Sequence, residues 1–267
     1  MFTVSDIYIY PIKSLGGFRV TEAVVTEKGF QHDRRWMLVD KEGIFMTQRK
    51  IPAMALLQTA ITPARIYVYH KQHPVKNINI PLISKPANIK QVKVWNDICD
   101  AWYYDEPINE WFSEILGKEC ELVYMPEETK RMVDPDYAKN NEITSFSDGY
   151  PFLIIGQSSL DELNSKLSEP LLIDRFRPNI VFTSGEPYIE DSWQHITING
   201  IDFFGVKTCG RCVVTTIDQQ TAVAGNEPLK TLASYRTINN KVKFGLNLLH
   251  KGTGAIKVGE TITVHGY

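Results

Sequence analysis

The stretch "TCGRCVVTTID", residues 208–218, holds two cysteines, Cys209 and Cys212, with Gly210 and Arg211 between them. Such a pair can form a disulfide, supply half of a zinc site, act as a redox couple, bind something through one thiolate, or be two small residues that enter a strand. Zinc is disfavoured because no second cysteine pair lies nearby to complete four ligands. A thioredoxin-type couple is disfavoured because the run after Cys212 predicts a strand and not a helix. The single thiolate, which Arg211 would favour, and the two small residues stay open as alternatives.

The composition is typical of a soluble globular protein that is large enough for two lobes. The chain has 267 residues, of which 43% are hydrophobic and 22% are charged. A net charge of −2 gives no reason to expect nucleic acid or an anionic membrane as a partner. No window reaches the roughly 18 apolar residues of a membrane-spanning helix, and the start lacks signal-peptide features, so we expect a cytoplasmic protein. Four cysteines are too few for a disulfide framework, and Cys99 and Cys120 are expected to be packed thiols.

Short extended runs dominate the sequence and predict a mainly β fold. Runs rich in Val, Ile, Tyr and Trp that end at turn residues predict strands, and they cover residues 2–10, 34–40, 65–70 and 91–95. Asn199 and Gly200 lie between two alternating runs, and this pair is the strongest short signal for a hairpin, because both turn positions need positive φ.

Few helices are expected. The apolar spacing over residues 106–117 predicts a helix that begins near Pro107 and ends at Gly117. Ser159 and Glu162 form a predicted capping box for a second helix, and a third short helix is expected after Pro228. The polar stretch 125–151 is typical of a long surface connection, and the boundary between two lobes is placed near residue 120.

Basic residues recur in three other segments. In residues 172–182 the alternation predicts an extended segment in which Arg175, Arg177 and Asn179 share one face, an arrangement that suits a phosphate or another polyanion. "YPIKSLGG" (10–17) holds a lysine and a serine on a loop, and "HDRRW" (32–36) adds two arginines at the start of a strand. Each segment taken alone is equally compatible with surface salt bridges.

Seven segments taken together are more specific than any of them alone. In chain order they are "YPIKS", "GFQHDRRWMLVD", "SDGYPFLI", "DRFRPNIVF", "DSW", "CGRCVVTTID" and "IKVGETITV". In this order and spacing the chain resembles the MOSC-domain proteins with an amino-terminal MOSC β-barrel domain, among them the mitochondrial amidoxime-reducing component and its bacterial counterparts. The resemblance implies a mainly β fold with a few helices (α+β). It also implies an N-terminal β-rich MOSC domain over 1–120, a MOSC β-barrel domain over 121–267, and a cofactor cleft between them.

The resemblance implies a molybdenum cofactor, that is, molybdopterin with a terminal phosphate and an oxo-molybdenum centre. Cys212 matches the position of the molybdenum ligand, so Cys209 is incidental. Asp148 matches an aspartate beside the metal that could relay protons. The remaining positions that match cofactor contacts are Lys13, Ser14 and Arg34 from the first lobe and Arg177, Asn179, Gly210 and Arg211 from the second. Cationic and donor groups from both lobes are what an anionic cofactor needs.

The function that the resemblance implies is reduction of a small N-hydroxylated substrate, N–OH to N–H, by a molybdenum-dependent oxidoreductase. The sequence shows no run of closely spaced cysteines as in a ferredoxin domain, so we expect a separate redox protein to donate the electrons. One alternative is a sulfur carrier with a persulfide on the same cysteine. Another is a non-catalytic protein that binds the molybdenum cofactor.

Overall fold

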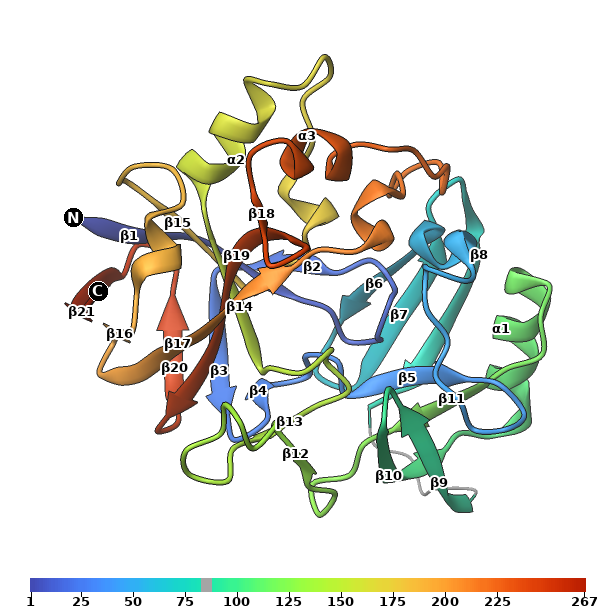
Figure 1. Ribbon diagram of the computed structural model, residues 1–267. Coiled ribbons are helices and arrows are strands. Elements are labelled where there is room, and N and C mark those ends of the chain that lie inside the picture. The colour runs from blue at the N-terminus through green and yellow to red at the C-terminus, as the bar shows by residue number, and fades with distance from the viewer. Residues whose placement is uncertain (83–87) are drawn as a thin grey trace.

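The computed structural model describes residues 1–82 and 88–267 and shows two β-rich bodies that lie side by side (Figure 1). The described residues form 21 strands, three α-helices and four short 3₁₀-helices. The mainly β fold with few helices is therefore confirmed. No helix in the described ranges is long and apolar enough to cross a membrane.

Seven strands close into a barrel that forms the larger body. Around the barrel they are β14 (Phe152–Gly156), β15 (Ile180–Thr183), β1 (Phe2–Ile9), β21 (Thr261–Gly266), β16 (His195–Ile198), β17 (Ile201–Gly210) and β19 (Lys241–Lys251). The ring closes because β19 also pairs with β14. Two short strands, β2 (Phe18–Val20) and β18 (Thr237–Ile238), extend it beside β1 and β19. Closure pairs the strand edges and gives the residues at one end of the barrel a rigid support.

The barrel interior is filled by the side chains that alternate inward along each strand. In β16, for example, Ile196 and Ile198 are buried while His195 and Thr197 are partly exposed. The predicted turn at Asn199 and Gly200 joins β16 to β17, with φ angles of 47° and 74°. The predicted hairpin is confirmed.

Two sheets and one helix build the smaller body. One sheet contains β6 (Leu57–Ile61), β7 (Arg65–His70) and β8 (His73–Pro81), and the other contains β5 (Trp36–Val39), β11 (Glu121–Tyr124), β10 (Asp97–Tyr103) and β9 (Asn88–Val94). Helix α1 (Glu106–Leu116) buries Phe112 against them, and it ends at Gly117 in the left-handed conformation, as predicted. The strands predicted over 2–10, 34–40, 65–70 and 91–95 correspond to β1, β5, β7 and β9.

The remaining elements are short. They are β3 (Glu22–Thr26), β4 (Gly29–Phe30), β12 (Arg131–Met132), β13 (Ile143–Thr144), β20 (Gly254–Lys257), α2 (Gln157–Asn164), α3 (Leu229–Ala233), η1 (Pro52–Leu56), η2 (Ile173–Arg175), η3 (Ile189–Ser192) and η4 (Val213–Thr216). Helix α3 confirms the helix expected after Pro228. Cys99 and Cys120 are buried free thiols, as expected.

Two parts of the first thirty residues, β1 and the segment from β2 to β4, pack with the barrel, although they precede the smaller body in the sequence. Val4 and Phe30 belong to the same buried cluster as Phe152 and Phe203. The chain leaves the barrel after β1 and enters the smaller body at Ile12, which bridges β5. Segments at this crossing are therefore placed between the two bodies. The division of the chain near residue 120 stays a prediction.

Two local predictions around the basic and cysteine segments were wrong. Residues 172–182 are not extended throughout, because η2 occupies the start and Arg177 adopts a left-handed φ of 54° before β15 begins at Ile180. The run after Cys212 forms the 3₁₀-helix η4 and not a strand. Tertiary contacts override the strand propensity of its β-branched residues here.

Two further local predictions were also wrong. Ser159 does not cap helix α2, which begins at Gln157, and its hydroxyl donates instead to the buried carboxylate of Glu190. The stretch 125–151 is not only a surface connection, since Ser145 and Phe146 within it are buried.

Strand β17 carries two register shifts, one between Gly205 and Lys207 and one between Thr208 and Gly210, on either side of Cys209. Such bulges bend a strand and redirect its end. Gly205 lies at the first shift, where a Cβ would stand 2.0 Å from the backbone oxygen of Trp193. The close approach of the two backbones requires a glycine at this position.

We predict that Gly205→Ala lowers the free energy of unfolding by about 1–3 kcal/mol, because the obstructing atom is a backbone oxygen that cannot rotate away. Gly266→Ala is the matched control in the same barrel, since its nearest neighbour would be an ordinary contact at 3.8 Å. Urea denaturation of both variants checks this. Equal stability of the two variants would contradict the assignment of the close approach.

Candidate functional site

A cavity of about 500 Å³ lies between the two bodies. All nine residues named in the sequence as cofactor contacts or catalytic groups line it: Lys13, Ser14, Arg34, Asp148, Arg177, Asn179, Gly210, Arg211 and Cys212. The smaller body contributes Arg49 and Trp95, and the barrel contributes the ends of β17 and β19. The structure thus brings together residues that are up to two hundred positions apart in the sequence, while their individual roles stay predictions.

The cavity is strongly cationic. Its cationic lining residues are Lys13, Arg34, Arg49, Arg175, Arg177, Lys207, Arg211, Lys241 and Lys243. Among the described lining residues, Asp148 is the one carboxylate. A concave site with such an excess of one charge attracts anions, and this local excess contrasts with the chain's overall net charge of −2.

Lys13 and Asp148 form an ion pair in which the lysine Nζ lies 2.6 Å from the carboxylate Oδ1. The Lys13 side chain is buried and also donates to the Phe146 carbonyl at 2.8 Å, whereas the Asp148 side chain keeps 76% of its surface accessible and faces the cavity. Desolvation opposes charge on Asp148, but Lys13 and the Trp95 N–H, 3.3 Å away, outweigh it, so the pKa of Asp148 lies below its usual range. Burial lowers the pKa of Lys13. The carboxylate is thus ionised and sits beside a buried ammonium.

Arg34 and Arg177 both lie against the ring of Tyr10. Each guanidinium carbon is 4.3 Å from the ring centroid, a distance typical of cation–π contacts. Arg34 also donates to Asp33 at 2.6 Å and to the Arg177 carbonyl at 3.0 Å. Burial, and then the charge of Arg34, lower the pKa of Arg177 to about 10, so the Arg177 side chain is charged at neutral pH. Tyr10 is fully buried and therefore fixes both cations in place.

Arg211 and Asn179 are held mainly by the protein itself. Arg211 donates to the carbonyls of Phe244 and Phe176 at 2.8 and 2.9 Å. The Asn179 oxygen accepts from Arg34 at 3.1 Å, and its amide group donates to a β1 carbonyl. Asn179 therefore orients Arg34 as well as lining the cavity. Within the described residues, the buried Nη2 atoms of Arg177 and Arg211 have no hydrogen-bond partner.

Four of the lining residues adopt the left-handed backbone conformation without being glycine. The φ angles are 67° for Ser14, 49° for Arg34, 57° for Trp95 and 54° for Arg177. Each such residue costs roughly 1–3 kcal/mol, and residues of this kind cluster at functional sites. The left-handed backbone directs these side chains into the cavity between the bodies. The residue types do not predict this conformation from the sequence.

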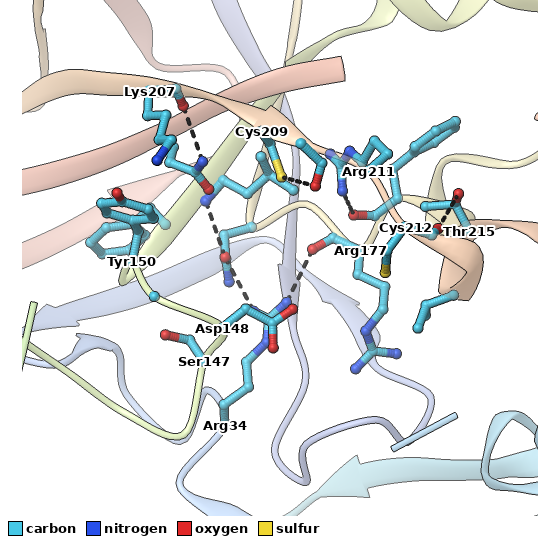
Figure 2. A pocket seen from close by; sticks show the side chains of 18 of the residues that line it. Arg34, Ser147, Asp148, Tyr150, Arg177, Lys207, Cys209, Arg211, Cys212 and Thr215 are labelled. Carbon is cyan, nitrogen blue, oxygen red and sulfur yellow. Dashed lines mark hydrogen bonds between the residues drawn. The ribbon is translucent and has the colours of Figure 1, made fainter. Parts of the chain in front are cut away.

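Cys212 lies at the point where β17 and the loop after it lead into η4. Figure 2 shows its sulfur directed toward the side of the cavity that holds the Arg177 guanidinium. The sulfur accepts a hydrogen bond from Arg49 Nη2 at 3.3 Å. Cys209 and Cys212 are both free thiols, and the described residues contain no cluster of three or more His, Cys, Asp or Glu that could hold a metal ion. The thiol and carboxylate side chains of the cavity lining that could donate to a metal are those of Cys212, Cys209 and Asp148.

Several residues of the cavity were missed in the sequence. Arg49 and Trp95 carry no motif, and Lys207, Lys241 and Lys243 stand singly in strand patterns where a lysine usually reads as solvent-exposed. Tyr10 stands inside the quoted segment "YPIKS" but carries no signal of its role as a support for two arginines. Only the fold shows that these residues meet.

The fold is that of a β protein with two bodies. The cavity between them is cationic and contains a cysteine. Residues 1–119 match the family described as "MOSC N-terminal beta barrel domain", and residues 141–263 match "MOSC domain". The chain belongs to the family of MOSC-domain proteins with an N-terminal MOSC β-barrel domain. The resemblance noted in the sequence is confirmed.

Relatives that match almost the whole of this chain agree with this assignment. The chain is 30% identical over 288 residues to "Mitochondrial amidoxime-reducing component 1" of Mus musculus, and the aligned region covers 99% of this chain and 82% of that protein. It is 31% identical over 282 residues to "Mitochondrial amidoxime reducing component 2" of Rattus norvegicus, with 97% and 82% covered. It is also 30% identical over 269 residues to "Molybdenum cofactor sulfurase" of Danio rerio, where 93% of this chain but only 32% of that protein is covered. The chain thus spans about a third of the length of this sulfurase.

We predict that Asp148→Asn destabilises the protein in a pH-dependent way. The pKa of Asp148 is lower in the folded protein, so its contribution to stability is present above the unfolded-state pKa of about 3.9 and is lost as the pH falls through the folded-state value. The difference in unfolding free energy between wild type and Asp148→Asn should therefore be largest near neutral pH and shrink in acid. Urea denaturation between pH 3 and pH 8 measures it.

The matched control is Asp136→Asn, at an exposed aspartate outside the cavity. Its unfolding free energy should differ from that of wild type by a small amount that does not follow the Asp148 profile. A pH-independent effect of Asp148→Asn would contradict the ion pair with Lys13 as the source of the stabilisation.

Proposed function

We propose that the cavity binds a molybdenum cofactor. The observation that carries the proposal is the convergence of basic side chains from both bodies and the Cys212 sulfur on one cavity of about 500 Å³. The donor set fits an anionic ligand with a terminal phosphate, because Arg177 and Arg211 each keep a buried Nη2 that no described protein atom accepts from. A single thiolate fits a metal that carries its remaining sulfur ligands with it.

In this proposal Cys212 supplies the thiolate ligand to molybdenum. The residues that would bind the remainder of the cofactor are Lys13, Ser14, Arg34, Arg177, Asn179, Gly210 and Arg211. The arginines are fixed on Tyr10 and on backbone carbonyls before any ligand arrives. Such preorganisation reduces the entropy lost on binding.

We propose further that the protein reduces small N-hydroxylated compounds. The bound cofactor supplies the two-electron redox chemistry. Conversion of N–OH to N–H with release of water consumes two electrons and two protons. Asp148 faces the cavity and accepts a hydrogen bond from Lys13, so in this proposal the Lys13 ammonium is the proton source and the carboxylate passes the proton on to the substrate. The electrons would come from a separate redox protein. Relatives named as amidoxime-reducing components over almost the whole chain favour this reaction.

A sulfur carrier is the second candidate, since a relative named as a molybdenum cofactor sulfurase also matches most of the chain. In that reading Cys212 would hold a persulfide and not a metal. The convergence of phosphate-binding groups favours the reductase, because a persulfide alone needs no such set.

We predict that the protein, purified from a host that makes the cofactor, contains molybdenum and pterin near one per chain. Cys212→Ala should lower the molybdenum content by about tenfold or more, because the protein ligand is lost. Metal analysis by mass spectrometry and fluorescence of the oxidised pterin measure both components.

Cys209→Ala is the matched control and should retain most of the metal, since Cys209 packs against an apolar cluster and, among the described residues, its Sγ hydrogen-bonds to the Gly210 carbonyl alone, at 3.9 Å. Equal loss of metal in both variants would contradict the assignment of a single ligand. Metal-free protein with labile sulfur on Cys212 would favour the sulfur carrier instead.

We also predict turnover by the metal-loaded protein. With a chemical reductant it should convert an aromatic N-hydroxyamidine or a hydroxylaminopurine to the dehydroxylated product, and chromatography of the products measures this. Failure of the metal-loaded protein to convert either compound would remove the reductase proposal while leaving cofactor binding in place.

A further inference from the structure

A loop of the smaller body reaches across to the cysteine segment of the barrel body. Its central residue, Gln48, is completely buried and forms a reciprocal amide pair with Gln219, with N–O distances of 3.2 and 3.0 Å. Gln48 also donates to the Ser14 carbonyl at 2.7 Å. Because a buried amide pair of this kind has no water to replace its partners, the loop is held firmly against the segment that follows Cys212.

The next residue in this loop, Arg49, extends from that anchor to the Cys212 sulfur. Its Nη2 lies 3.3 Å from Sγ, and its guanidinium carbon lies 4.9 Å from the centre of the Trp95 ring. Trp95 is itself fixed, because its N–H donates to Asp148 at 3.3 Å. Its backbone has a left-handed φ of 57°, which is rare for a bulky residue. A strained tryptophan therefore supports an arginine over the sulfur.

Arg49 differs from the other arginines of the cavity in how its donors are used. Arg34, Arg175, Arg177 and Arg211 donate to carboxylates or backbone carbonyls. Arg49, by contrast, is exposed to solvent, and within the described residues the Cys212 sulfur is its one hydrogen-bond acceptor. Its remaining N–H groups are therefore available to an incoming ligand beside the sulfur.

We infer that Arg49 is a positioning residue that orients the Cys212 sulfur and attracts anionic groups to it. The ligand class that it selects is a small anion or an oxyanion, such as a carboxylate. The inference rests on Cys212 being the reactive sulfur of the proposed function. It does not depend on which reaction follows, so it can be tested in the cofactor-free chain.

The test compares two alkylating reagents that differ in charge. The Cys212 thiolate displaces iodide from iodoacetate, which is anionic, or from iodoacetamide, which is neutral, and in each case a C–S bond forms as the C–I bond breaks. A cation about 4 Å from the reacting sulfur should raise the iodoacetate rate relative to the iodoacetamide rate by roughly three- to fivefold. Arg49→Gln should remove that factor, whereas Arg49→Lys should retain part of it. Salt near 1 M should reduce the wild-type ratio toward that of Arg49→Gln.

Two controls separate this effect from a general change. Trypsin cleaves after Arg211 and puts Cys209 and Cys212 in different peptides, so Cys209 serves as an internal reference for mass spectrometry. Lys50→Gln removes one neighbouring exposed charge and should leave the Cys212 ratio unchanged. A ratio unchanged in Arg49→Gln, or a Cys212 that neither reagent modifies, would overturn the inference. Loss of metal binding in Arg49→Gln with an unchanged difference between the reagents in wild type would not overturn it. Thermal unfolding of each variant shows whether the variant is folded.

Discussion

Repulsion between like charges is the constraint on which the arrangement of this protein depends. Arg34 and Arg177 both lie on the buried ring of Tyr10, and further lysines and arginines face the same cavity. Asp33 and Asp148 offset only part of this charge. Strained backbone, a closed barrel and buried carbonyl contacts hold the cations together. A bound polyanion would remove the repulsion, and the free energy released would add to its affinity.

Both bodies are needed for this arrangement, because the arginine that hydrogen-bonds to the Cys212 sulfur comes from the other body. The barrel supplies Cys212 and most of the arginines, while the smaller body supplies Arg49 and its support Trp95. The contacts that join the bodies are polar and buried, as in the Gln48–Gln219 pair. Polar contacts of this kind fix one relative orientation, since a sliding motion would leave amide groups without partners.

The sequence predicted the parts of this structure that local patterns control. The amphipathic spacing of α1, the turn at Asn199 and Gly200 and the β-rich runs are all properties of neighbouring residues, and the structure contains each of them. The conformation of residues 172–182 and of the run after Cys212 was wrong, because contacts with distant segments decide it. Arg49 and Trp95 were missed for the same reason: their role comes from where the chain crosses between the bodies.

Strand β1 occupies a place in the barrel that has a consequence for how the chain is made. Its two barrel neighbours are β15 (Ile180–Thr183) and β21 (Thr261–Gly266), both of which are synthesised long after it. During translation β1 therefore leaves the ribosome without either partner and with an open edge, which is a hazard for aggregation. The barrel closes only when the last strand has emerged. Pairings between strands so distant in the sequence favour slow folding. The edge of β1 that faces its barrel partners therefore stays unpaired throughout synthesis of the chain.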